Sequence, residues 1–225
     1  MRRSAIGQLI WKDWRLQRSQ IVLTIVAGAI GLAIMQWGGG EPPLVVGGVC
    51  FFIALIMVAH MLPIAGIINE RKKQNLAFLM SLPVSSLQYT TAKLISSLLM
   101  FLIPWLTLVI SAVLLIETRG IIPRGAIPVL LILAFLPFVG FSLITGASLV
   151  GETEGWGIAA NVFCSSSYGL VWYFMTRVPQ LMLPAQTQSP SWNSTALTIL
   201  AAEGAAVALI LGLTYFLQSR KRDFV

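Results

Sequence analysis

Six long apolar runs constrain the fold of this chain more than any other feature. A helix needs about 20 consecutive apolar residues to cross the hydrocarbon core of a bilayer, and runs of about that length occupy residues 21–37, 44–68, 94–116, 127–150, 155–175 and 197–217. Only 10% of the 225 residues are charged and 57% are hydrophobic, whereas about a quarter of the residues in soluble domains are charged. The sequence therefore predicts an all-α integral membrane protein with six transmembrane helices, in a single transmembrane domain over residues 1–225.

The basic residues gather beside alternate apolar runs. Twelve of the 15 Lys and Arg residues lie before the first run, between the second and third runs, or after the sixth run. Loops rich in Lys and Arg remain on the cytoplasmic side of a membrane. We therefore expect a multi-pass protein of a cell membrane with both termini in the cytoplasm. The expected membrane is the cytoplasmic (inner) membrane of a bacterium. The basic residues then serve orientation and contact with membrane lipids, and no nucleic-acid partner is predicted.

Residues 4–19 precede the first apolar run and have the pattern of an amphipathic helix. Such a helix lies in the membrane interface, with its apolar face toward the acyl chains. The alternative is a solvated basic leader. The predicted apolar face consists of Ile6, Leu9, Ile10 and Trp14, and the polar face of Gln8, Lys12, Arg15 and Ser19.

A polar and basic segment, residues 70–93, separates the second and third apolar runs. Asn75 is a suitable N-cap for a short helix over residues 76–82, which Pro83 ends. Ser85 and Gln88 have the spacing of a capping box, so a new helix is predicted to begin there. The short helix carries apolar side chains outside the predicted spans. From spacing alone, it either docks on another protein or lies flat on lipid.

This segment resembles part of a known family. Its charged residues, the following L-x-F-L-x-S-L-P-V-S and a Lys ten residues after the Pro are similar to the cytoplasmic loop of permease subunits in the ABC-2 type family of ABC transporters. In that family the loop carries a coupling helix that sits in a groove of the ATP-binding subunit. The resemblance therefore implies that the residues coupling this chain to an ATPase subunit are Glu70, Arg71, Lys72, Lys73, Leu76, Phe78, Leu79, Leu82 and Pro83.

The resemblance implies the membrane-spanning permease subunit of an ATP-driven ABC exporter. The implied assembly contains two copies of an ATP-binding subunit, a second permease subunit in a homo- or heterodimer, and surrounding membrane lipids. The chain has no G-x-x-x-x-G-K-[ST] motif with which to bind nucleotide phosphates. We therefore expect no cofactor in this chain, because ATP and Mg would be bound by the partner subunit. No catalytic residue is predicted, and a single His gives no basis for a metal site.

His60 and Glu203 are ionisable residues inside predicted spans. A charge at the centre of a membrane helix costs roughly 2.5–3.5 kcal/mol on insertion scales, and such residues usually face a cavity or a partner. Both are candidates for a translocation pathway, and the alternative is that each is neutral and hydrogen-bonded to a neighbouring helix. A second functional reading follows from them, a secondary transporter driven by ions or protons that bind His60 and Glu203.

The charge distribution makes a prediction about topology. A reporter enzyme fused at Gly39 or Gln188 should be active outside the membrane, and one fused after Val225 should be active in the cytoplasm. The measurement is reporter activity in intact cells at matched expression. A carboxyl terminus outside the cell would contradict the predicted topology.

Overall fold

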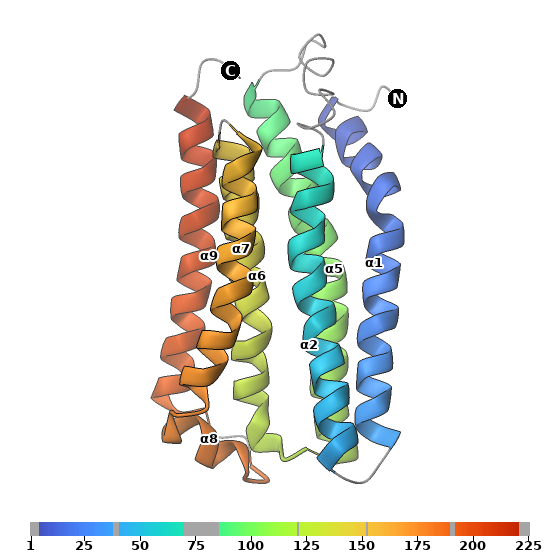
Figure 1. Ribbon diagram of the computed structural model, residues 1–225, viewed down its shortest axis with the longest axis vertical. Coiled ribbons are helices and arrows are strands. Elements are labelled where there is room, and N and C mark those ends of the chain that lie inside the picture. Colours follow the sequence, from blue (N-terminus) through green and yellow to red (C-terminus); the bar gives the residue numbers. More distant parts are fainter. Residues whose placement is uncertain are drawn as a thin grey trace.

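The computed structural model describes residues 5–37, 41–69, 86–120, 122–151, 153–189 and 192–220. Within these ranges the regular elements are helices, and the long ones lie side by side in one bundle (Figure 1). Their order along the chain is α1 (Ala5–Trp37), α2 (Glu41–Pro63), the π-helix η1 (Ile64–Ile68), α5 (Ser86–Arg119), the 3-10 helix η2 (Arg124–Ala126), α6 (Ile127–Val150), α7 (Glu154–Met175), α8 (Pro179–Ala185) and α9 (Ser194–Arg220).

Five of the described helical segments are long and apolar enough to cross a membrane. They are Ile10–Trp37, Glu41–Ile68, Tyr89–Arg119, Arg124–Val150 and Ser194–Arg220. The segment predicted as the fifth span forms α7, which packs against α6 but is not among these five. Its polar content, with Asn161 and three consecutive Ser residues from 165 to 167, explains the difference.

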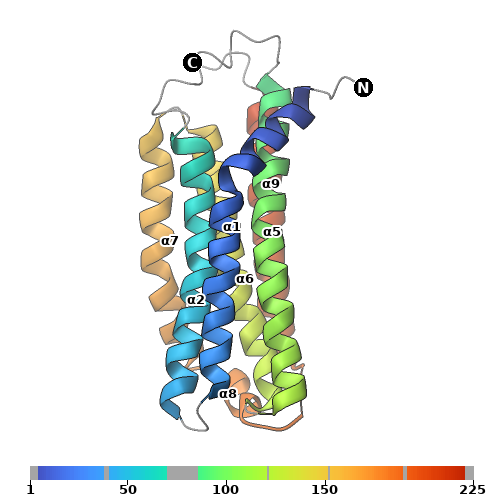
Figure 2. The same ribbon diagram turned by 90° about the vertical axis from the view of Figure 1, so that its right-hand side faces the viewer.

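Helix α1 is continuous from Ala5 to Trp37. The predicted interfacial helix over residues 4–19 and the predicted first span therefore belong to one element in the structure. Figure 2 shows the first turns of α1 bending away from the line of the rest of the helix. The residues that α1 buries here are Asp13, Gln17 and Ile21, which lie four apart on one face. Polar side chains of this segment thus pack into the protein.

Helix α6 is the centre of the bundle. It packs against α9, α7 and α2, while α1 packs along α2 and α5. The main apolar core joins α5 to α6, where the rings of Phe101 and Phe141 stack with their centroids 4.4 Å apart. The indole of Trp105 donates a hydrogen bond of 2.7 Å to the carbonyl oxygen of Ala134 on α6. These contacts fix α5 and α6 against each other by shape and by direction.

Helices α1 and α2 approach closely at glycines. A Cβ atom added to Gly47 would lie 2.5 Å from the carbonyl oxygen of Gly31, which only a residue without a side chain allows. Gly146 of α6 similarly lies against Thr214 of α9.

Prolines have different effects in different helices. Helices α5 and α6 continue through Pro104 and Pro137. Regular α-helix ends after Pro63, and the wide turns of η1 follow. The short helix α8 lies between α7 and α9 in the chain, and its Leu181 is buried against Ile132 of α6.

The helix ends alternate between the two ends of the bundle. Helix α1 begins, η1 ends, α5 begins and α9 ends at the same end, which is at the top of Figure 1 and is called the upper end below. Helix α1 ends, α2 begins, α5 ends and α6 begins at the lower end, where α8 also lies. The described chain therefore leaves α2 and enters α5 on one side of the bundle.

Candidate functional site

A buried ion pair joins three elements near the upper end of the bundle. The ammonium group of Lys93 on α5 lies 3.0 and 2.9 Å from the two carboxylate oxygens of Asp13 on α1. It also donates a hydrogen bond of 2.9 Å to the carbonyl oxygen of Gly66 in η1. The exposed fractions of Lys93 and Asp13 are 1% and 3%. These two residues are called the buried ion pair below.

The local structure explains why the pair forms here. Thr90, Lys93 and Ser97 are buried on one face of α5. The Ser96 hydroxyl donates a hydrogen bond of 3.0 Å to a carboxylate oxygen of Asp13. A regular α-helix uses each carbonyl for the amide four residues later, whereas η1 uses the wider i to i+5 pattern, as in the bond from the Asn69 amide to the Ile64 carbonyl. The three ammonium hydrogens of Lys93 then meet three acceptors.

Glycine at position 66 allows α1 to come close to η1. A Cβ atom on Gly66 would lie 2.6 Å from the side-chain nitrogen of Gln17, one turn after Asp13 on α1. The carboxylate has a further cation at its edge, since the ammonium of Lys12 lies 3.8 Å from it and is 39% exposed. The buried charges therefore balance, and the arrangement fastens α1, η1 and α5 rather than presenting a reactive group.

Sequence reasoning missed this pair. It assigned Lys93 to the basic edge of a span and did not give Asp13 a structural role. The available signal was a single carboxylate in an otherwise basic and apolar amino-terminal segment, because a carboxylate so close to a span usually has a cationic partner. The partner itself could not be chosen, since Asp13 and Lys93 are 80 residues apart.

His60 forms a second polar cluster, between α2 and α7. Its Nε2 lies 3.0 Å from the hydroxyl of Tyr168, and its Nδ1 is hydrogen-bonded to the amide oxygen of Asn161, with the hydroxyl of Ser165 at 3.4 Å. The three partners occupy one face of α7 at spacings of four and three residues. Gly140 of α6 gives the tyrosine room, since a Cβ there would lie 2.2 Å from its hydroxyl. These hydrogen bonds agree with the predicted alternative in which His60 is hydrogen-bonded to a neighbouring helix.

Glu203 lies on the inward face of α9, in line with the buried residues Ala196, Val207 and Thr214. Its side chain is partly buried, and its Oε2 is enclosed without a hydrogen-bond partner among the described residues. His60 and Glu203 are on different helices with different surroundings, and no described contact joins them. The structure therefore does not bring the two pathway candidates into one site.

The predicted coupling residues, 70–83, lie outside the described residues. Their flanks are described. Helix α5 begins at Ser86, next to the predicted cap at Ser85, and the chain before the segment ends in η1 and Asn69. Both flanks are at the upper end. Gly66 in the first flank accepts a hydrogen bond from the ammonium group of Lys93, which belongs to the second flank.

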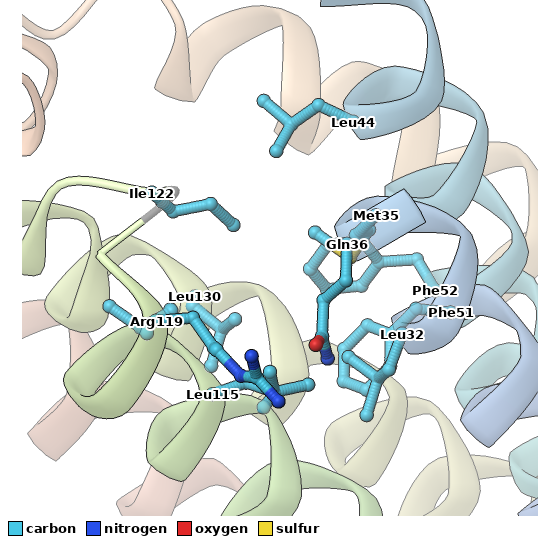
Figure 3. A pocket seen from close by; sticks show the side chains of 12 residues that line it. Leu32, Met35, Gln36, Leu44, Phe51, Phe52, Leu115, Arg119, Ile122 and Leu130 are labelled. Carbon is cyan, nitrogen blue, oxygen red and sulfur yellow. The ribbon is translucent and has the colours of Figure 1, made fainter. Parts of the chain in front are cut away.

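Two hollows lie beside α1. At the lower end, the side chains of Gln36 and Arg119 reach into a cavity of about 40 Å³ that is otherwise apolar, with Phe51 and Leu115 among its lining (Figure 3). That volume holds only a few water molecules. At the upper end, a groove of about 510 Å³ opens between α1 and α5, lined by Trp11, Trp14 and Ser96 among others. Ser96 connects this groove to the buried ion pair.

Comparison with known proteins identifies a family. A family model described as "ABC-2 family transporter protein" matches residues 8–220 of the chain. The match includes the buried ion pair, His60, Glu203 and the segment between η1 and α5. Searches of the curated proteins and of the solved structures find no match.

The buried ion pair makes a prediction about stability. Lys93→Met leaves the carboxylate of Asp13 buried without its cation, so the free energy of unfolding should fall by about 3–5 kcal/mol. Asp13→Leu with Lys93→Met removes both charges and should stay near the parent protein, since an apolar pair of similar volume is often neutral or stabilising.

Thermal melting of the purified protein in detergent ranks these variants. The control is Arg124→Met, which breaks the exposed pair of Arg124 with Glu117, 3.0 Å apart, and should cost about 0–1 kcal/mol. A single variant Lys93→Met that melts with the Arg124→Met control would contradict the structural role of the pair.

Proposed function

Because the chain belongs to the ABC-2 family of transporter proteins, we propose that it is the membrane-spanning permease subunit of an ATP-driven exporter. Hydrolysis of ATP takes place in a separate ATP-binding subunit, since the chain has no P-loop motif of its own. ATP and Mg are bound by that subunit, and this chain holds no cofactor. The permease converts closure of the ATP-binding subunits into movement of its helices.

One observation carries the proposal. The family match covers the segment between η1 and α5, and the helices on both sides of that segment are fastened to α1 by a buried ion pair. Because η1, α5 and α1 are bonded to one another, a displacement of this segment moves all three. If its two ends were loosely packed, the displacement would stay local. This supports residues 70–83 as the coupling region, with Leu76, Phe78, Leu79 and Leu82 as its apolar contact surface and Pro83 as its end.

The membrane topology that we propose has six spans. Helix α7 is the sixth spanning element besides the five long apolar helices, because it lies along α6 in the bundle and its polar residues Asn161 and Tyr168 are hydrogen-bonded to His60 of α2. Its opposite face carries exposed Trp156, Phe163 and Phe174, which suits lipid. The upper end then faces the cytoplasm of a bacterium, with both termini, the coupling region and the interfacial turns of α1.

The assembly that we propose contains two permease subunits and two ATP-binding subunits. A homodimer or a heterodimer of permeases fits equally, because the bundle has exposed apolar surface on several helices. The mass of the complex purified with its lipids measures this composition. A complex with a single permease chain would overturn it.

Glu203 is the stronger of the two pathway candidates, because one oxygen of its partly buried carboxyl group has no described partner, whereas both ring nitrogens of His60 are hydrogen-bonded to α7. Glu203→Gln should change ATP-dependent transport while expression and ATPase assembly remain at the parent level. The measurement is uptake of a fluorescent lipid, a labelled peptide and a cationic dye into inverted vesicles. Unchanged uptake of all transported probes by Glu203→Leu would reduce Glu203 to a packing role.

Leu79 tests the coupling region. Burial of one Leu contributes about 1.5–3 kcal/mol, so Leu79→Asp should weaken the ATPase contact more than loss of one exposed ion pair, worth ~0–1 kcal/mol. Insertion should be unaffected, because position 79 lies outside the spans. Ser85→Ala, which removes a helix cap worth roughly 1 kcal/mol, is the milder control.

The readouts are co-purification of the ATPase subunit and ATP hydrolysis by the complex, at matched expression. If Leu79→Asp co-purifies and hydrolyses ATP like the parent, the segment lies on lipid and docking on the ATPase is wrong.

A further inference from the structure

We propose that the buried ion pair is a positioning joint for transport, through which a displacement of the segment between η1 and α5 reaches helix α1. This inference rests on the proposed function, in which the ATP-binding subunit docks on that segment. Lys93 is the positioning residue. It touches no substrate and acts through α1.

The joint lies where both ends of the segment enter the bundle. Gly66 is four residues before Glu70, and Lys93 is seven residues after Ser86 at the start of α5. The ammonium group of Lys93, on α5, is hydrogen-bonded to Gly66 in η1 and to the carboxylate of Asp13 on α1. A movement of the segment therefore acts on the junction of η1, α5 and α1, whichever of its two ends moves first.

The chemistry of the junction makes it directional. Charge-assisted hydrogen bonds weaken steeply when they lengthen or bend, so helices joined by them move together or part. Apolar packing contains no such directional bonds. The exposed fractions of 1% and 3% for Lys93 and Asp13 leave almost no access for water to replace these bonds. Ser96 holds the carboxylate from the side with a further bond of 3.0 Å.

The π-helix gives the junction a part that can change shape. Its i to i+5 bond from the Asn69 amide to the Ile64 carbonyl marks a wider turn than an α-helix has, and π-turns are frequent at functional sites. The side-chain nitrogen of Gln17 lies so close to Gly66 that a Cβ there would sit 2.6 Å from it. A change in the winding of η1 would therefore press on α1 at Gln17 and pull on it at Asp13.

The test uses the complete complex of permease and ATPase in lipid nanodiscs. An environment-sensitive dye is attached to Leu16→Cys on α1 or to Leu209→Cys on α9, in a background with Cys50→Ala and Cys164→Ala. Leu16 and Leu209 are similarly exposed, at 66% and 64%. The emission of the dye is recorded before and after trapping of the ATPase with ATP and vanadate.

The variant is Asp13→Leu with Lys93→Met, which removes the joint without leaving a buried charge alone. Its matched control is Glu117→Leu with Arg124→Met, the same exchange at an exposed ion pair between the lower end of α5 and η2. In the parent and in the control, trapping should shift the emission at position 16. In the joint variant that shift should be lost, while the ATPase still co-purifies and hydrolyses ATP, and the response at position 209 should equal that of the parent.

Two results would overturn the joint. One is a full shift at position 16 in the joint variant, and the other is no shift at position 16 in a parent complex that hydrolyses ATP. Failure of the docking proposal has a different signature, since it appears as unimpaired ATPase co-purification with Leu79→Asp and does not depend on the dye. The two hypotheses are therefore separated in one set of preparations.

Discussion

A polar group that a membrane protein buries must find its partner inside the protein, because hydrocarbon offers no hydrogen bonds. In this bundle that constraint decides which helices meet. Apolar faces in lipid are weakly selective for one another, so close packing at small residues and polar contacts between helices have to specify the arrangement. Gly31 and Gly47 bring α1 and α2 together, and Asp13 with Lys93 fixes α1 against α5 and η1. The side chain of Gln218 reaches from α9 to the carbonyl of Leu149 on α6 for the same reason.

These contacts divide the bundle into two groups of helices. Helices α1, α2 and α5 are fastened to one another at the upper end by the buried ion pair, and α6 holds α7 and α9. The groups meet where α2 and α5 pack on α6, and where His60 on α2 bonds to Asn161 and Tyr168 on α7. In the proposed transporter the first group receives the movement of the ATP-binding subunit. The first group touches α7 directly at the hydrogen bonds of His60 and at the contact of Ile68 in η1 with Gly157.

The sequence allowed the helical class and most helix positions to be predicted, because six apolar runs of membrane length leave few other folds. The start of α5 beside Ser85 and the polar character of α7 were readable from capping spacing and composition. The continuous α1, the π-helix after Pro63 and the helix α8 were not, since each depends on contacts between distant segments. Asp13 shows the limit most clearly. Sequence reasoning gave it no structural role, because its burial follows only from the approach of Lys93 and Gly66.

His60 and Glu203 look alike in sequence, because each is a single ionisable residue in an apolar run. The structure separates them by their partners. The two ring nitrogens of a neutral imidazole need one donor and one acceptor, and the amide oxygen of Asn161 with the hydroxyl of Tyr168 supplies both for one tautomer. A residue whose capacity is filled in this way holds helices together, and a passing molecule would have to displace α7 to reach it. The enclosed carboxylate oxygen of Glu203 has no described partner. Burial of this oxygen without a hydrogen bond lowers the stability of the fold, and no described contact offsets the loss. Glu203 is therefore a better candidate than His60 for a role in transport.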